Sequence, residues 1–226
     1  MEYDLAYLIE QAQSINNTTN VTIYDPSLVK CILFKIVCGI STLHSSEVVH
    51  LNISPVSILL TPTNRTLFDV QLGCLSKAIS TQSIDTQEHI NVKITNYSAP
   101  ELCGKWSRIS NWKAVDMWAI GCIFVQLLGA TQPIFTASSG AHLLTQIKKI
   151  VVDTPDYFSF IQDKDGRDLV QSLLAEDPLK RPTAQKVLSH PFFSGMSPLD
   201  RDIVPRSASE CMDDKISLFI DSNCPL

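Results

Sequence analysis

The polar residues best placed to do chemistry lie between residues 49 and 60, in the run Val-His-Leu-Asn-Ile-Ser-Pro-Val-Ser-Ile-Leu-Leu. His50, Asn52, Ser54 and Ser57 are interspersed there with apolar residues. The amide of Asn52 could orient a hydroxyl group, but it cannot accept a proton as a catalytic base must. The hydroxyl of Ser57 would be a weak, neutral metal ligand at best. The segment therefore offers hydrogen bonding without a base or an anionic ligand.

Other candidate sites in the sequence are also incomplete. Gln71-Leu72-Gly73 begins with an amide, which cannot supply the anionic oxygen that Mg²⁺ prefers. His44 and His50 have no third metal ligand nearby. The run Ala-Ser-Ser-Gly at 137–140 lacks the glycine spacing and the lysine of a phosphate-binding loop. Cys122 falls within an apolar helical pattern, where a thiol is expected to be inert.

Apolar residues at three- and four-residue spacing predict the helices that position these groups. The clearest pattern covers 26–46, opened by Asp25-Pro26, and 113–128 is apolar on nearly every face, which predicts a buried central axis. We also expect helices at 4–13, 139–152, 165–175 and 183–189, strands near 57–61 and 66–71 with a turn at 61–64, and a long loop at 76–97. The predicted fold class is mainly α, a helical bundle around a buried central helix with a small β-hairpin.

The segment at 49–60 resembles the catalytic loop of the eukaryotic protein kinases, whose pattern is His-Arg-Asp-Leu-Lys-Pro-x-Asn followed by a short apolar strand. Three further motifs, in the same order as in that family, support the resemblance. Tyr97-x-Ala99-Pro100-Glu101 resembles the end of an activation segment, 116–123 the central helix of the large lobe, and Asp177-Pro178-x-x-Arg181-Pro182 with His190-Pro191-Phe192-Phe193 the C-terminal signature. The residues at these motifs are most similar to those of the cyclin-dependent and MAP-kinase branch. The expected organisation is a kinase-like large lobe over residues 1–193 and a flexible tail over 194–226.

The resemblance implies structural roles for several residues. Glu101 and Arg181 should form a buried ion pair that clamps the end of the activation segment to the last helices. Asp116 should accept backbone N–H bonds from the catalytic loop. His50 and Leu72 should stack in an apolar spine of the large lobe.

The positions that perform phosphoryl transfer depart from the family pattern. They hold Asn52 for the base, Ser54 for the lysine, and Ser57 and Gln71 for the two metal ligands. A slip in register would instead bring Asp69 closer to the second metal position. Leu51 replaces the arginine that receives an activating phosphate. Because all of these positions are changed, no catalytic or metal-binding residue is expected to be intact, and no cofactor is expected. Losing a positioned base alone costs about 10²–10⁴-fold in rate.

The sequence begins where the hinge between the two kinase lobes would lie, at Met1-Glu2-Tyr3. It contains no Gly-rich phosphate loop and no Val-Ala-x-Lys strand, so the small lobe is expected to be absent. Either the chain is naturally truncated, or upstream sequence is missing from the recorded start. Loss of the small lobe should expose apolar surface around Leu5, Leu8, Ile58 and Leu60, and such a patch usually marks a partner site.

The composition limits which binding partners and which cellular compartment are expected. The net charge is −5 and the basic residues are scattered, which argues against nucleic acid or a membrane as the main partner. The apolar run 117–135 is interrupted by Gln126, Gln132 and Pro133, which is typical of a core helix rather than a membrane span. Seven cysteines without a Cys-x-x-Cys pair, and no signal-type run, predict a cytoplasmic or nuclear setting.

Three functional hypotheses remain open. The first is a catalytically impaired, kinase-derived (pseudokinase) binding or regulatory module, whose protein partner would be a kinase, a cyclin-like regulator or a second copy of the chain. The second is a protein serine/threonine kinase that uses ATP and Mg²⁺, if upstream sequence and non-standard residues complete the site. The third is a decaying duplicate whose product does little.

Overall fold

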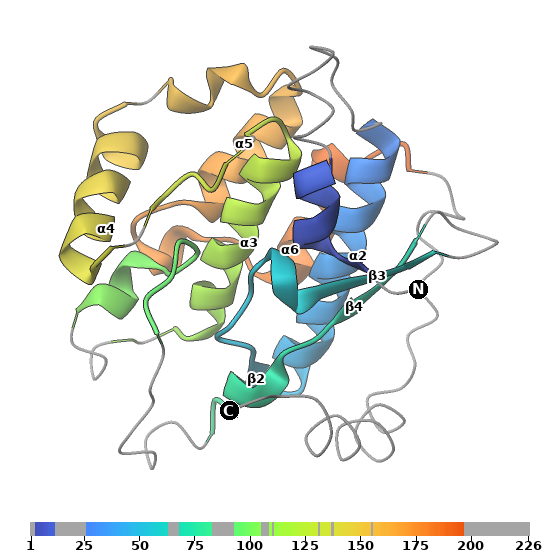
Figure 1. Ribbon diagram of the computed structural model, residues 1–226, viewed down its shortest axis with the longest axis horizontal. Coiled ribbons are helices and arrows are strands. Elements are labelled where there is room, and N and C mark those ends of the chain that lie inside the picture. The colour runs from blue at the N-terminus through green and yellow to red at the C-terminus, as the bar shows by residue number, and fades with distance from the viewer. Residues whose placement is uncertain are drawn as a thin grey trace.

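The computed structural model describes residues 3–11, 26–62, 68–82, 93–104, 109, 111–130, 132–136, 138–154 and 156–196. Within these ranges the chain is mainly helical, with helices packed around one central helix (Figure 1). This confirms the predicted mainly α class. Residues 5–11 are helical, as predicted for 4–13. Most of the predicted tail, from residue 197 onward, lies outside the described residues.

Helix α3 (Lys113–Leu127) is the central axis, as its sequence predicts. Every residue of α3 after Lys113 is buried. Helix α5 (Lys164–Leu173) packs closely against it at Gly121, where a Cβ atom would lie 2.9 Å from the Cβ of Leu173. Such a contact is too short for any side chain, so glycine lets the two helices approach one another.

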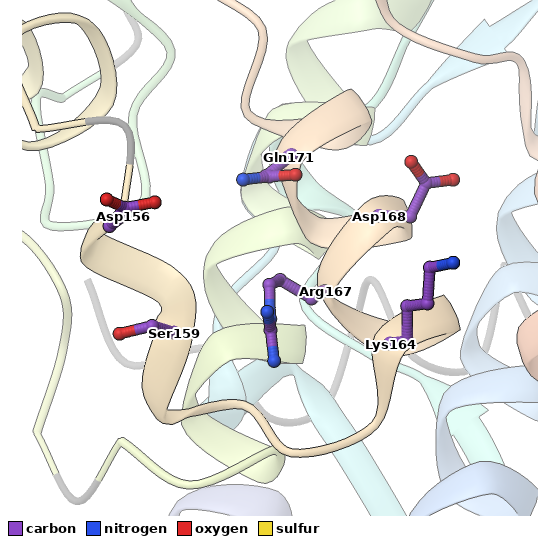
Figure 2. Close-up of a pocket in the computed structure, with 6 residues that line it drawn as sticks. All are labelled: Asp156, Ser159, Lys164, Arg167, Asp168 and Gln171. Carbon is purple, nitrogen blue, oxygen red and sulfur yellow. The ribbon is translucent and has the colours of Figure 1, made fainter.

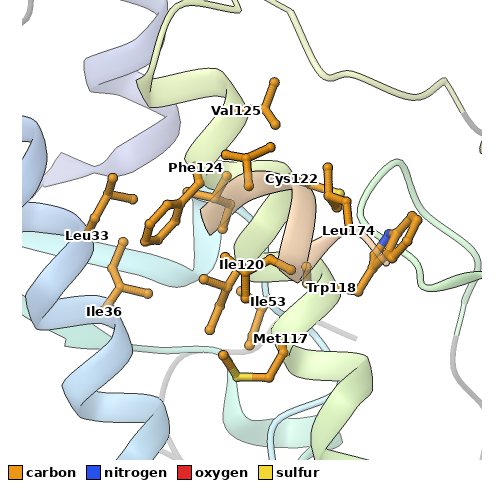
Figure 3. Packing of buried hydrophobic residues seen from close by; sticks show 14 of the residues in the cluster. Leu33, Ile36, Ile53, Met117, Trp118, Ile120, Cys122, Phe124, Val125 and Leu174 are labelled. Carbon is orange, nitrogen blue, oxygen red and sulfur yellow. The ribbon is translucent and has the colours of Figure 1, made fainter. Parts of the chain in front are cut away.

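Helix α2 (Pro26–Ser45) confirms the helix predicted for 26–46. By length and composition alone it could cross a membrane. However, it packs against α3, against strand β4 (Phe68–Leu72) and against helix α6 (Ala184–Leu188), as a core helix does. Figure 3 shows Leu33 and Ile36 of α2 facing Phe124 of α3 within the buried cluster.

A three-stranded antiparallel sheet supports the loop that carries the candidate residues. Its order is β1 (Tyr3–Asp4), β3 (Ile58–Pro62) and β4, and the register pairs Ile58 with Leu72. The strands predicted near 57–61 and 66–71 are thus confirmed to within two residues. Thr61 and Pro62 belong to β3 rather than to a turn, and the rest of the predicted turn lies outside the described residues.

The segment predicted as a long loop, 76–97, contains a strand that the sequence does not reveal. Strand β5 (Ile79–Ser80) pairs antiparallel with β2 (Val48–Val49), just before the candidate loop. A short 3₁₀ turn, η2 (Leu75–Lys77), precedes it. The prediction was wrong here because a two-residue strand has no periodicity and forms only through its distant partner. Residues 83–92 lie outside the described residues.

The last third of the described chain is a set of capped helices and turns. Helix α4 (Gly140–Ile147) continues into a π-helical turn, η6 (Lys148–Val152), which matches the helix predicted for 139–152. Ser139 caps α4 by accepting the N–H of His142, so the helix is entered at this residue. The 3₁₀ turns that complete this region are η7 (Tyr157–Phe160), η8 (Pro178–Lys180) and η9 (Pro191–Phe193), while η1 (Pro55–Ser57) and η4 (Pro100–Cys103) occur earlier in the chain.

The predicted apolar patch around Leu5, Leu8, Ile58 and Leu60 is largely absent from the surface. Leu5, Ile58 and Leu60 are fully buried, and Leu8 is half-buried. The two β3 residues share the strand face that enters the core, because alternate residues of a strand point the same way. The expectation was wrong because it took these side chains to point away from the helices instead of into the core.

Candidate functional site

The candidate loop at 50–57 is held in place by a buried carboxylate. Asp116 of α3 accepts the backbone N–H of His50 at 2.8 Å and that of Leu51 at 2.9 Å. Its Oδ2 atom also lies 2.9 Å from Nε2 of His44, at the end of α2. The predicted role of Asp116 is confirmed, and His44 is a further partner that the sequence did not indicate. These bonds hold Leu51 in the left-handed backbone region, at φ 59°.

The ring of His50 is fixed in one neutral tautomer. The backbone N–H of Asn52 donates to Nδ1 of His50 at 3.2 Å, so Nε2 must carry the proton that is shared with the carbonyl of Gly73 at 2.9 Å. Burial lowers the pKa of His50, although the nearby Asp116 opposes that shift. His50 thus ties the loop to the end of β4 as a neutral hydrogen-bond bridge. The predicted stacking of His50 on Leu72 remains a prediction, while Leu72 itself packs against the core.

Ser57, predicted at one metal position, is committed to the loop itself. Its hydroxyl donates to the carbonyl of Ser54 at 2.8 Å and accepts the N–H of Ser54 at 3.0 Å. The residue is fully buried. The hydroxyl therefore closes the turn that contains η1, and one lone pair remains for any other purpose.

Gln71, predicted at the second metal position, lies on β4 opposite Leu59 and is exposed. Its amide donates to Oδ2 of Asp69 at 3.4 Å. Asp69 pairs with Thr61, and Thr61 lies further from the loop along β3 than Leu59 does. The strand pairing therefore does not support Asp69 as a replacement for Gln71 at the second metal position. Residues 70–76 contain no Asp or Glu, so no shift of the alignment within this segment brings a carboxylate to the metal position.

This set of donors does not fit a magnesium–nucleotide site. Mg²⁺ prefers carboxylate oxygens, and the two candidate positions offer a committed hydroxyl and an exposed amide. Among the residues that the structure describes, no three His, Cys, Asp or Glu side chains come together as a metal site would require. Asn52, at the base position, is half-buried and offers no carboxylate.

The predicted ion pair between Glu101 and Arg181 is confirmed. The Arg181 guanidinium donates to both carboxylate oxygens, at 2.6 and 2.8 Å, and also to the carbonyls of Ala114, Ala175 and Glu176. It lies over the Trp118 ring at 4.9 Å from the centroid. Arg181 joins η4, α3 and η8 at one buried point, so its role is to hold the fold.

A cavity of about 80 Å³ opens beside the candidate loop. Asn52 and Ser54 form one wall, and Lys77, Lys93 and Thr95 are among the residues that complete it. Sequence reasoning did not find the two lysines, because they lie 16 positions apart in a segment without periodicity. The cavity is far smaller than the 300–1,000 Å³ that is usual for small-molecule sites.

A larger cavity, of about 260 Å³, lies between η7 and α5 and shares no residue with the loop. Figure 2 shows Arg167 between Asp156 and Ser159 on one side and Lys164 and Asp168 on the other. Arg167 donates twice to the carbonyl of Ile161, so much of its guanidinium is already used. This mixture of charges on an exposed surface shows no catalytic arrangement.

Comparison with known proteins agrees with the fold. Residues 3–193 match the family described as "Protein kinase domain". A solved structure of the Rad53 kinase domain and SCD2 superposes with a TM-score of 0.62 at 26% identity, over 87% of this chain and 64% of that one. The chain therefore belongs to the protein kinase domain family.

Curated relatives are consistent with that family. Mitogen-activated protein kinase 13 of Oryza sativa subsp. indica is 27% identical over 89% of this chain and 43% of its own length. Mitogen-activated protein kinase kinase kinase YODA of Arabidopsis thaliana is 32% identical over 79% of this chain and 19% of its own. The chain thus spans less than half the length of these relatives.

Proposed function

We propose that this chain is a catalytically impaired, kinase-like module that acts by binding other proteins. The observation that carries the proposal is the state of Ser57: its hydroxyl is buried and bonded in both directions within the loop. Together with neutral Asn52 and exposed Gln71, this leaves the loop without a group that can offset the charge of a triphosphate. Residues 1–193 would form the large-lobe region, and 194–226 a tail.

The proposed setting and partner follow from the same features. The cysteines that the structure describes are free thiols, which supports a cytoplasmic or nuclear setting. Proteins of this family act on or with other proteins, so a kinase, a cyclin-like regulator or a second copy of the chain is the proposed partner class.

Nucleotide binding by the purified 226-residue chain tests the proposal. With ATP at about 1 mM, a site with a Kd of ~10 μM would stabilise the fold by about 2.7 kcal/mol, which is several degrees in melting temperature. We expect no shift, with or without Mg²⁺, beside an active protein kinase as the positive control. A Mg²⁺-dependent shift together with phosphate transfer to a protein substrate would favour the serine/threonine kinase hypothesis instead.

A further inference from the structure

The small cavity beside the candidate loop has an unbalanced positive charge. Its ionisable lining residues are Lys77, Lys93, Asp116 and Tyr97. Asp116 is buried and its two oxygens receive hydrogen bonds from His50, Leu51 and His44. Tyr97 stays neutral, because burial raises its pKa and its hydroxyl donates to Gln126. Because Asp116 is engaged by these bonds away from the lysines' segments, the two ammonium groups leave the described lining with a net positive charge.

Neither lysine has an ion-pair partner among the residues that the structure describes, and both are exposed. Lys77 is at the end of η2, after the left-handed Cys74, and Lys93 precedes Thr95, whose N–H donates to Ser98 Oγ at 2.8 Å. The two lysines therefore reach the cavity from separate segments. Their charges favour an anion at the opening.

The size of the cavity limits that anion to a small group. About 80 Å³ admits a few heavy atoms and excludes a nucleotide. A phosphate monoester carries about −1.5 to −2 charges at pH 7 and three acceptor oxygens, which suit two ammonium groups and the Asn52 amide. A carboxylate at position 52 would repel that group, whereas the amide can donate to it.

We propose that this cavity binds the phosphorylated serine or threonine side chain of a protein partner. This inference deepens the proposed function and rests on it, since a chain that does not transfer phosphate could instead retain a product-like side chain. Lys77 and Lys93 neutralise the phosphate, and Asn52 donates a hydrogen bond. Apolar Leu102 and Val115 in the lining accept the aliphatic part of the residue.

The test is a backbone-amide NMR titration of the full chain with three probes: N-acetyl-phosphoserine methylamide, N-acetyl-serine methylamide, and inorganic phosphate. We expect saturable shifts at 52–54 and 95–98 with the phosphoserine compound, none with the serine compound, and at least fivefold weaker binding of inorganic phosphate. Equal affinity for inorganic phosphate would reduce the cavity to a general anion site. Shifts confined to other regions, or none, would overturn the proposal.

Matched variants distinguish the effect of the two cavity lysines on binding from the effect of surface charge in general. The pair Lys77→Ser and Lys93→Ser should weaken phosphoserine binding at least tenfold, while the exposed pair Lys180→Ser and Lys186→Ser, outside the cavity, should change it less than twofold. Asn52→Asp should weaken it about tenfold through charge repulsion. Unchanged affinity in the Lys77/Lys93 variant, with an unchanged melting temperature, would contradict the assignment.

The two proposals can fail separately. Mg²⁺-dependent ATP binding together with phosphate transfer to a protein substrate, with intact phosphoserine binding, would overturn the catalytically impaired function and keep the cavity assignment. Absence of both nucleotide and phosphoserine binding would leave the impaired function standing and remove the cavity assignment.

Discussion

Two polar assemblies in this molecule differ in whether they contain charged side chains. The clamp of Glu101 and Arg181 has a partner for every charged group, and the bonds of Arg181 to Glu101 and Ala114 join segments that are distant in sequence. The loop at 50–57 keeps its backbone anchor on Asp116, yet its side chains at the proposed reactive positions carry no charge. The backbone anchor of this loop and the chemistry of its side chains therefore depend on different atoms.

The largest effect should come from breaking the clamp. Arg181→Met leaves the Glu101 carboxylate and three carbonyls without their donor, and we expect a loss of about 3–5 kcal/mol in the free energy of unfolding. Urea denaturation measures it. The partly exposed pair Lys113–Glu47, whose N–O distance is 2.8 Å, is the control: Lys113→Met should destabilise the fold far less, because solvent screens this pair. Equal losses would show that burial does not distinguish the two pairs.

The next effect should come from the anchor of the loop. Asp116→Asn removes the charge that His50, Leu51 and His44 share, with an expected cost of about 2–4 kcal/mol. Amide hydrogen exchange should accelerate at His50 and Leu51 more than at the interior of α2. Uniform acceleration in both places would mean that Asp116 stabilises the whole fold and does not specifically hold the loop.

A smaller effect should appear as a dependence on pH. Because burial holds the pKa of His50 below the ordinary value of 6.5, the unfolded chain takes up a proton before the folded chain does. The stability that the neutral ring contributes is complete above about pH 6.5 and is lost as the pH falls below it. We expect about 1 kcal/mol less stability at pH 5.5 than at pH 7.5 from this residue. Urea midpoints of the wild type should change more steeply than those of His50→Gln, and identical slopes would contradict the assignment.

The smallest effect should come from the proposed reactive positions themselves. Asn52→Asp and Gln71→Asp together should change the free energy of unfolding by about 0.5 kcal/mol or less, because neither side chain contributes a described hydrogen bond that holds the fold together. The variant should still transfer no phosphate to a protein substrate. Restored transfer would mean that these two side chains alone account for the proposed impairment.

The sequence predicts those parts of the fold that have a period or a motif. Helices α2 and α3 follow from repeating apolar residues, and Asp116, Glu101 and Arg181 follow from motif order. Strand β5 and the meeting of Lys77 with Lys93 could not be predicted, since both depend on contacts between distant segments. The direction of Leu60 was missed for a related reason: the core face of a strand is known only once its register is known.

Leu51 has a left-handed backbone that most side chains avoid, and Asp116 holds it through main-chain N–H groups, which every residue except proline possesses. The backbone of the loop at 51, 52 and 54 is therefore nearly independent of the side chains at those three positions. A chain built in this way can exchange its side chains at 51, 52 and 54 by single substitutions while remaining folded. The loop is thus a place where new binding specificity can arise, or be engineered, at little risk to the rest of the molecule.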